Sequence, residues 1–222
     1  MRRKIVEELG GFREGTDGSQ DYDLFLRFTD KKRQIHHIPR VLYHWRKIPG
    51  SAAASIDAKP YALEAAKKAL TDALRRRGIR GEVTDGLWKG SYRVRREIEG
   101  EPLISIIIPF RDQVEVLKNC LDSIFAKTSW QNYEILLVNN ASELLQTREY
   151  IREIEHCPRV RLLHYNAPFN YSAINNFASL RAAGEYLLLL NNDTEVIEPD
   201  WIQNMLEHAQ RPEVGAVGAK LL

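Results

Sequence analysis

The 222-residue chain contains little cysteine, no excess of one charge and no long hydrophobic run. Its cysteines, Cys120 and Cys157, make neither a metal-ligand spacing nor a disulfide framework, which is typical of reduced thiols in the cytosol. Lys and Arg total 32 against 30 Asp and Glu, so the basic excess of a nucleic-acid-binding surface is missing. The longest aliphatic runs, at 106–108 and 187–190, are too short to span a bilayer. These absences predict a cytoplasmic protein without a nucleic-acid partner or a transmembrane segment, and they leave peripheral attachment to the inner face of the membrane open.

Three regions of the chain differ in texture. Residues 1–56 combine short helices with extended pieces on either side of Pro39, and they predict a small α+β segment. Residues 57–100 predict a helical connector that begins at Pro60, followed by a linker with at most one exposed strand near 92–94. Residues 101–222 predict a sheet domain, so the chain as a whole is expected to be α/β.

Two helices of the first two regions carry clear sequence signals. Ser19 precedes a helix predicted over 20–31 and is its candidate N-cap. The apolar side of that helix is expected to contain Leu24, Phe25 and Phe28. The apolar face of the helix after Pro60 is expected to contain Leu63, Ala66, Leu70 and Leu74.

The third region alternates apolar runs with amphipathic segments. The runs that predict buried strands are 103–108, 133–138, 160–163, 186–190 and 214–217. The segments that predict helices are 114–125, 144–154, 172–183 and 201–209. Strands that alternate with helices indicate βαβ units and a mostly parallel sheet.

Polar residues follow three of the predicted strands at the point where each strand ends. They are Pro109-Phe110-Arg111-Asp112, Asn139-Asn140-Ala141-Ser142 and Asn191-Asn192-Asp193-Thr194. Asn and Asp are common turn residues, so one such loop alone would be ordinary. Because open parallel sheets bind ligands at the carboxyl ends of their strands, the three loops together favour a ligand site.

The chain has no glycine-rich phosphate loop. Neither G-x-G-x-x-G nor G-x-x-x-x-G-K-[ST] occurs, which argues against a classical dinucleotide site and against P-loop chemistry. A diphosphate bound without such a loop needs another partner for its charge, and a divalent cation held by a carboxylate is the usual one. Asp193, at the end of its apolar run, is the natural ligand for Mn²⁺ or Mg²⁺.

From Ile104 to Leu222 the sequence resembles the N-terminal half of family-2 glycosyltransferases with the GT-A fold, a Rossmann-like sheet. The most specific strings are Phe169-Asn170-Tyr171-Ser172-Ala173-Ile174-Asn175-Asn176 and Leu190-Asn191-Asn192-Asp193-Thr194-Glu195-Val196. These strings are similar to those of bacterial enzymes that build rhamnose-containing or O-antigen polysaccharides. The resemblance therefore implies a nucleotide-sugar donor and a saccharide or lipid-linked saccharide acceptor.

The resemblance also implies which residues form the donor site. By position, the nucleotide-binding residues are Pro109, Phe110, Asp112, Asn139, Asn140, Asn175, Asn176 and Asn191. Asn139-Asn140 stands where the family more often has Asp-Asp. The Asp-x-Asp metal motif of the family corresponds to 191–193, in which only Asp193 keeps a carboxylate.

The first region resembles the opposite, acceptor-side end of the same family. The strings are Gly10-Gly11-Phe12 and Ser19-Gln20-Asp21-Tyr22-Asp23-Leu24-Phe25-Leu26-Arg27. The resemblance implies that Asp21 is the general base that deprotonates the acceptor, with Asp23 as the alternative. Both residues would also suit the first turn of a helix, where the dipole favours acidic side chains. His44, in Tyr43-His44-Trp45-Arg46, is a candidate metal ligand or diphosphate contact, or a structural histidine.

The acceptor-side end thus precedes the donor-side beginning. The simplest interpretation is a tandem glycosyltransferase, with the tail of one catalytic domain in residues 1–56, a connector in 57–100 and the front half of the next domain in 101–222. An alternative hypothesis is that the two parts dock as one permuted domain.

Inverting sugar transfer in cell-surface polysaccharide synthesis is the expected activity of the intact enzyme. A nucleotidyltransferase, or a non-catalytic nucleotide-binding or assembly fragment, is the alternative. An exposed sheet edge in the donor half would also favour self-association.

Overall fold

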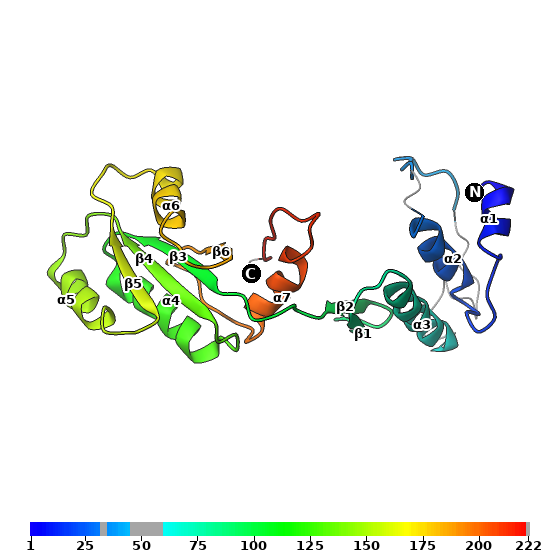
Figure 1. Ribbon diagram of the computed structural model, residues 1–222, viewed down its shortest axis with the longest axis horizontal. Helices are drawn as coiled ribbons and strands as arrows, with labels where there is room; N and C mark the ends of the chain where they lie inside the picture. Colours follow the sequence, from blue (N-terminus) through cyan, green and yellow to red (C-terminus); the bar gives the residue numbers. More distant parts are fainter. Residues whose placement is uncertain (32–34, 45–59, 221–222) are drawn as a thin grey trace. The chain divides into compact units, whose positions relative to one another are not determined.

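The computed structural model describes residues 1–31, 35–44 and 60–220. The chain divides into two compact units, unit 1 (Met1–Glu97) and unit 2 (Ile98–Leu222), and each is described by itself. Figure 1 labels their helices and strands in chain order. No helix among the described residues is long and apolar enough to cross a membrane.

The described part of unit 1 contains a short first helix, two longer helices that pack together and a hairpin. Its elements are α1 (Arg3–Glu8), α2 (Gln20–Thr29), α3 (Pro60–Arg76), β1 (Gly81–Asp85) and β2 (Tyr92–Arg96). Helix α3 begins at Pro60, whose ring suits a first helical position, and it ends before Gly78. Gly78 has a φ of 64°, and its N–H donates to the Arg75 carbonyl at 3.1 Å, so it closes the helix in the left-handed conformation that glycine favours.

The apolar contacts of unit 1 differ from the predicted ones. In α2, Leu24 is buried as expected, but Phe25 is 53% exposed. The buried residues of α3 are Ala65, Ala66, Ala69, Ala73 and Leu74, so a face of small residues packs inward in place of the larger leucines Leu63 and Leu70. Small side chains let the backbones of two helices approach closely, which the leucine pattern alone did not indicate.

Two further expectations for unit 1 are corrected. Ser19 does occupy the N-cap position of α2, but its side chain does not cap the helix; its Oγ donates to the Ala62 carbonyl of α3 at 2.8 Å. The segment expected to be a linker with one exposed strand forms the antiparallel β1–β2 hairpin, with Val83 opposite Val94. In the described residues 35–44, neither extended piece beside Pro39 becomes a regular strand.

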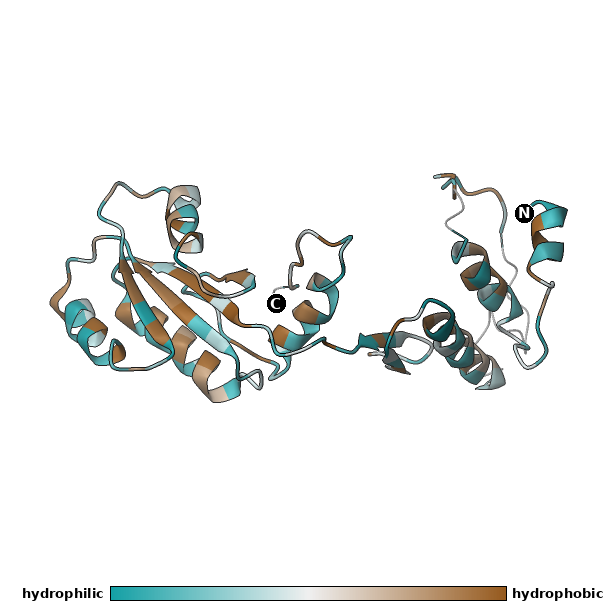
Figure 2. Ribbon diagram, viewed as in Figure 1, coloured by the Kyte–Doolittle hydropathy of each residue, from teal (hydrophilic) through white to brown (hydrophobic). Residues whose placement is uncertain are grey.

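Unit 2 is a four-stranded parallel sheet in the order β5-β4-β3-β6. Its elements are β3 (Ile104–Phe110), α4 (Val114–Lys127), β4 (Tyr133–Asn139), α5 (Leu145–Ile154), β5 (Val160–His164), α6 (Tyr171–Ser179), β6 (Tyr186–Leu189) and α7 (Trp201–Ala209). The predicted α/β class and parallel sheet are confirmed. Apolar residues concentrate along these strands (Figure 2).

The two faces of the sheet bury different sets of side chains. Ile104, Ile106 and Ile108 of β3 share one core with α4, α5 and α7, through residues such as Leu121, Ile151 and Ile202. On the other face, Ile107 packs in a smaller cluster with Ile174 and Ala178 of α6. The period-two alternation of a strand thus sends neighbouring isoleucines to opposite cores.

The predicted strand at 214–217 does not form. Its residues are partly or fully exposed, and among the described residues no strand pairs with them. Its two valines are separated by Gly215 and Ala216, and a run this short needs a hydrogen-bonded neighbour to become a strand. Helix α6 also ends at Ser179, four residues before the predicted end.

Candidate functional site

The order of the strands brings the predicted polar loops to one edge of unit 2. Strand β3 lies between β4 and β6, so the carboxyl ends of these three parallel strands are neighbours. The chain runs outward from β3 to β4 and β5 and then returns to the other side of β3 with β6. Such a reversal of strand order is the place where open α/β sheets form a ligand crevice.

Asp112 ties the loop after β3 to the loop after β4. Its backbone N–H donates to Ser142 Oγ at 2.8 Å, and its Oδ1 accepts from the backbone N–H groups of Glu143 and Leu144 at 3.1 and 3.0 Å. Asp112 adopts a left-handed φ of 50°, a conformation that Asp tolerates better than most residues. The Asp112 carboxylate therefore positions the neighbouring loop.

Asn139 and Asn140, at the end of β4, are both buried. Asn139 Oδ1 accepts from Ser142 N–H at 2.9 Å, so this amide shapes its own loop. Asn140 Nδ2 donates to the carbonyls of Tyr165 and Ala167 at 3.0 and 2.9 Å, which fixes the chain after β5. Asn140 Oδ1 is buried and has no hydrogen-bond partner.

A second buried acceptor without a partner comes from α6. Asn170 caps this helix, since its Oδ1 accepts from Ala173 N–H at 3.0 Å. One turn later, Asn175 Nδ2 donates to the Tyr171 carbonyl at 2.8 Å, while its buried Oδ1 has no partner. Asn176 is exposed. Buried polar atoms are nearly always hydrogen-bonded in proteins. Asn140 Oδ1 and Asn175 Oδ1 share the lack of a partner with Tyr133 Oη, Thr147 Oγ1 and Gln203 Oε1 among the described residues, and they are the two that belong to predicted site residues.

The backbone after β6 is held in place while its carboxylate stays exposed. Thr194 Oγ1 and Cys120 Sγ donate to the Asn191 carbonyl at 2.8 and 3.8 Å, and Tyr171 Oη donates to Asn191 Oδ1 at 3.5 Å. Burial raises the pKa of the Cys120 thiol, which keeps it a neutral donor. In the described part of the chain, no hydrogen bond or ion pair engages the Asp193 carboxylate.

The residues at this edge fit a metal ion only if a ligand completes its coordination. Among the described residues, no three His, Cys, Asp or Glu side chains cluster as a metal cage. Asp193 is a single accessible carboxylate beside the amides of Asn191 and Asn192. Mg²⁺ and similar ions commonly take one or two protein carboxylates and complete their shell with phosphate oxygens and water, and this arrangement suits that mode.

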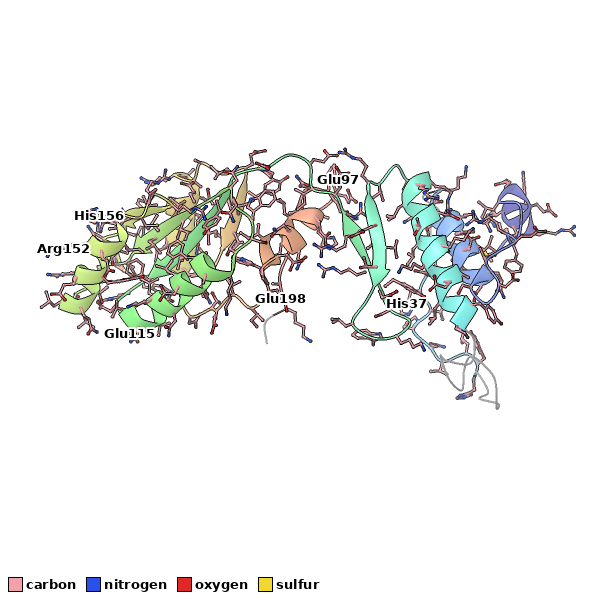
Figure 3. The ribbon with its side chains drawn as sticks, turned by 90° about the horizontal axis from the view of Figure 1, so that it is seen from below. His37, Glu97, Glu115, Arg152, His156 and Glu198 are labelled. Carbon is pink, nitrogen blue, oxygen red and sulfur yellow. The ribbon has the colours of Figure 1, made fainter. Side chains whose placement is uncertain are left out.

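A hollow of about 380 Å³ adjoins the β4 loop on the α5 side. Asn139 lines it together with Arg148 and Arg152 of α5 and His164 at the end of β5. Figure 3 labels Arg152 on α5. The two arginines outnumber the one lining carboxylate, Glu155, so the lining of the hollow carries a net positive charge.

In unit 1, Asp23 is fully buried and both of its carboxylate oxygens are occupied. Arg13 donates to both oxygens, with Nε 3.1 Å from Oδ2, and Arg27 Nε donates to Oδ2 at 2.9 Å. Arg27 also donates to the carbonyls of Leu9 and Gly11 at 2.5 and 2.6 Å. Burial alone would raise the pKa of Asp23, but the guanidinium hydrogen bonds outweigh it and hold the pKa below its ordinary value. A carboxylate bound in this way is a weak base. Asp23 therefore has a structural role, because through Arg27 it links α2 to the Gly10-Gly11 turn.

Asp21 and His44 have more open surroundings. Asp21 lies in the first turn of α2 and is exposed, with its Oδ1 accepting from Tyr22 N–H at 2.9 Å. His44 is exposed as well, next to residues that lie outside the described part of the chain. Both belong to unit 1, whereas Asp193 belongs to unit 2.

Several residues of the site were not predicted from the sequence. Ser142 joins the first two loops, while Tyr171 and Cys120 hold the third. Their roles depend on contacts between residues that are 20 to 71 positions apart. The only available signal for Tyr171 was its position within the Phe169–Asn176 string.

The chain matches one family model and is similar to several known proteins. The model of the family described as "Glycosyl transferase family 2" matches residues 105–221. The chain is 50% identical over 221 residues to "Uncharacterized protein y4gI" of Sinorhizobium fredii; the aligned region covers 98% of this chain and 24% of that protein. It is 42% identical over its whole length to "O-antigen biosynthesis protein RfbC" of Myxococcus xanthus, of which it covers 17%. Among solved structures, a mannosyltransferase of Pyrobaculum calidifontis in complex with GDP-Man and Mn²⁺ is 20% identical, with a TM-score of 0.47, over 72% of this chain and 46% of that one.

The family match covers more than half of the chain, and the chain therefore belongs to glycosyl transferase family 2. This membership sets aside the nucleotidyltransferase alternative. The chain spans about a quarter of y4gI and about a sixth of RfbC.

Proposed function

We propose that this chain forms part of an enzyme that transfers a sugar from a nucleotide-diphosphate sugar to a saccharide or lipid-linked saccharide, with inversion, in cell-surface polysaccharide synthesis. The observation that carries the proposal is made at one edge of unit 2, where the carboxyl ends of three adjacent parallel strands meet. Two buried amide oxygens without partners, Asn140 Oδ1 after β4 and Asn175 Oδ1 on α6, belong to this part of the unit. Family membership and the similarity to an O-antigen biosynthesis protein support it.

In this proposal, the donor nucleotide binds at the edge formed by the β3, β4 and β6 loops. Asn140 Oδ1 and Asn175 Oδ1 accept hydrogen bonds from N–H or O–H groups of the base or ribose, which satisfies both buried atoms. Asp112 and Asn139 hold the loops in shape, because their side-chain oxygens already accept backbone N–H groups. Pro109, Asn176 and Asn191 are proposed as further nucleotide contacts. The Phe110 side chain is 4% exposed and packs in the larger core, so Phe110 supports this edge from inside the sheet and does not contact the nucleotide.

The proposed metal ligand is Asp193. A divalent ion bound there would supply positive charge that stabilises the departing nucleoside diphosphate. Asp193 is suited to this because its carboxylate is exposed, while the backbone at Asn191 is fixed by Thr194 and Cys120. His44 is a proposed metal or diphosphate contact of the other catalytic domain, to which the acceptor-side segment belongs.

The proposed general base is Asp21. Its carboxylate takes the proton of the acceptor hydroxyl as the acceptor oxygen bonds to the anomeric carbon and the bond from that carbon to the diphosphate oxygen breaks. We assign Asp21 to one catalytic domain and Asp193 to the next, in a tandem enzyme. The similarity to two much longer proteins across 98–100% of this chain supports the contiguous order of the two units in such an enzyme.

The donor half of the proposal is tested by thermal unfolding with UDP, dTDP and GDP, each with and without Mn²⁺. A nucleotide at about 100 times its dissociation constant should add roughly 2.7 kcal/mol to the stability of unit 2, a shift of about 10 °C. We expect Asp193→Ala to remove the Mn²⁺-dependent part of this shift. The matched control is Glu198→Ala, which deletes an exposed carboxylate from the same segment (Figure 3).

The outcomes are distinct. A Mn²⁺-dependent shift that survives in Glu198→Ala but not in Asp193→Ala supports the assigned donor site and identifies the nucleotide. A shift that Asp193→Ala leaves intact would mean that the ion binds elsewhere. No shift with any nucleotide would contradict the proposal that this edge binds the donor and would favour an assembly role for the segment.

A further inference from the structure

The β1–β2 turn of unit 1 presents large apolar side chains to water. Leu87 is 95% exposed and Trp88 is 70% exposed at the tip of this hairpin, whose first strand contacts α3 (Figure 1). Leaving a tryptophan in water forfeits the hydrophobic free energy that burial would supply. Single exposed apolar residues are common, whereas adjacent ones form a patch that a ligand or a partner can cover.

The turn is ordered by its own hydrogen bonds. Ser91 Oγ donates to the Trp88 carbonyl at 2.6 Å and accepts from Trp88 N–H at 3.2 Å, while Gly86 N–H donates to the Ser91 carbonyl at 2.9 Å. A Cβ at position 86 would lie 2.3 Å from Ser91 Oγ, so glycine is required for this closure. The backbone at Trp88 is therefore held in one conformation, which lowers the entropy cost of binding a ligand there.

A hollow of about 310 Å³ lies between this turn and the N-terminal part of α3. Its aromatic lining comes from Trp88 and Tyr92, and its carboxylates come from Glu64 and Asp85. Within the described ranges, neither the Glu64 carboxylate nor the Trp88 indole N–H forms a hydrogen bond or ion pair. Asp85 is exposed and has one long ion pair, 3.4 Å from Lys67 Nζ.

This lining matches the chemistry of a sugar ring. A pyranose has an apolar face of C–H groups, which an aromatic ring can cover, and a rim of hydroxyl groups. Carboxylates accept hydrogen bonds from hydroxyls, and the indole N–H donates to a hydroxyl oxygen. Tyr92 Oη is already used, since it donates to the Leu63 carbonyl at 2.8 Å, so Tyr92 supplies a fixed wall.

The charge of the lining disfavours the other ligands that an exposed tryptophan could contact. Glu64 and Asp85 outnumber the single lining cation, Lys89. A surface for phosphate groups or anionic lipids would carry a basic excess. A neutral polyhydroxyl ligand is the class that both the aromatic and the acidic side chains accommodate.

We infer that the hollow between the β1–β2 turn and α3 binds a neutral saccharide, with Trp88 covering the sugar ring and Glu64 and Asp85 accepting hydrogen bonds from its hydroxyls. The inference rests on unit 1 alone, so it stands or falls separately from nucleotide binding by unit 2. Such a site would hold a glycan in unit 1 through residues that have no proposed catalytic role.

The test is NMR titration of the whole 222-residue chain, read at the indole N–H signals of its four tryptophans. The probes are a rhamnose, a mannose and an N-acetylglucosamine trisaccharide, with inorganic phosphate and vesicles of phosphatidylcholine and phosphatidylglycerol as separate arms. We expect at least one trisaccharide at about 10 mM to shift the Trp88 signal but not those of Trp130 and Trp201. Glu64→Gln should weaken this binding at least tenfold, and Trp88→Ala should abolish changes in the backbone signals of Glu64 and Asp85.

Phe12→Ala is the control, since it removes an exposed aromatic side chain of unit 1 that does not line the hollow. A saccharide bound in the hollow should bind this variant within about threefold of the parent affinity. No trisaccharide-dependent change at Trp88 would overturn the inference. A response to vesicles or phosphate in place of sugars would overturn it as well and would identify a lipid surface or an anion as the ligand.

Discussion

The buried carboxylate of Asp23 allows a direct test of how unit 1 is held together. The change is Asp23→Ala, which removes the acceptor shared by Arg13 and Arg27. Asp23 is 0% exposed and the Arg27 side chain only 8% exposed, so the variant leaves a guanidinium buried without its counter-charge. Breaking a buried pair from one side typically costs about 3–5 kcal/mol.

That cost is large for a unit of this size. Native proteins have an unfolding free energy of about 5–15 kcal/mol, so Asp23→Ala should remove about a fifth of it or more. Urea unfolding followed by circular dichroism measures the change. The matched control is Asp21→Ala, two positions earlier on the same helix and exposed, which should alter stability by no more than about 0.5 kcal/mol.

The same pair of variants separates structure from catalysis. In the proposed tandem enzyme, Asp21→Ala should abolish transfer with little change in stability, while Asp23→Ala should lower the amount of folded protein. An Asp23→Ala variant as stable as the parent would refute the view that this carboxylate ties α2 to the Gly10-Gly11 turn.

Two further predictions follow from charge and from the sheet edge. Burial alone would raise the pKa values of Asp23, Asp30 and Asp72, but hydrogen bonds from arginines hold all three pKa values below the ordinary one. These carboxylates therefore stabilise unit 1 when the pH is above about 4, the pKa of Asp in the unfolded chain, and the stabilisation is lost as the pH falls below that value. Urea titrations should show unit 1 weakening below about pH 4, with a shallower slope in Asp30→Asn; a slope unchanged by that variant would count against the assignment. Strand β6 is an edge strand in the described sheet, with Leu187 and Leu189 about half exposed, so the chain should self-associate as its concentration rises. Sedimentation velocity should detect this, and Leu189→Lys should shift the population to monomer; a parent chain that stays monomeric at all concentrations would contradict it.

The elements of unit 2 could be predicted because their patterns are local. The isoleucines of β3 and the stripe from Val114 to Ile124 repeat with the periods of a strand and a helix, and both are buried as those periods require. The 214–217 run shows the limit of this reasoning, since a strand also needs a neighbour to pair with. The β1–β2 hairpin was underestimated because arginines alternate with the few apolar residues of β2.

The sequence predicted where in the sheet the candidate site lies, but it did not predict the contacts that form the site. The abrupt change from apolar to polar residues located the edge of the sheet. It did not indicate that Asp112 would accept from Glu143 and Leu144, or that Asn140 would hold the segment at Tyr165. Those contacts depend on loop conformations, such as the left-handed backbone of Asp112, that no short-range pattern specifies.

The unequal cores of unit 2 have a consequence for how its site opens. Helix α6 carries Asn175 but is anchored to the sheet mainly by Ile174 and Ala178, whereas α4 on the other face contributes Leu117, Leu121 and Ile124 to a far larger core. Local opening of α6 should therefore require less free energy than opening α4. Amide hydrogens of α6 should exchange fastest among the site's supporting elements in the free chain, and a nucleotide that binds Asn175 would slow that exchange without affecting α4.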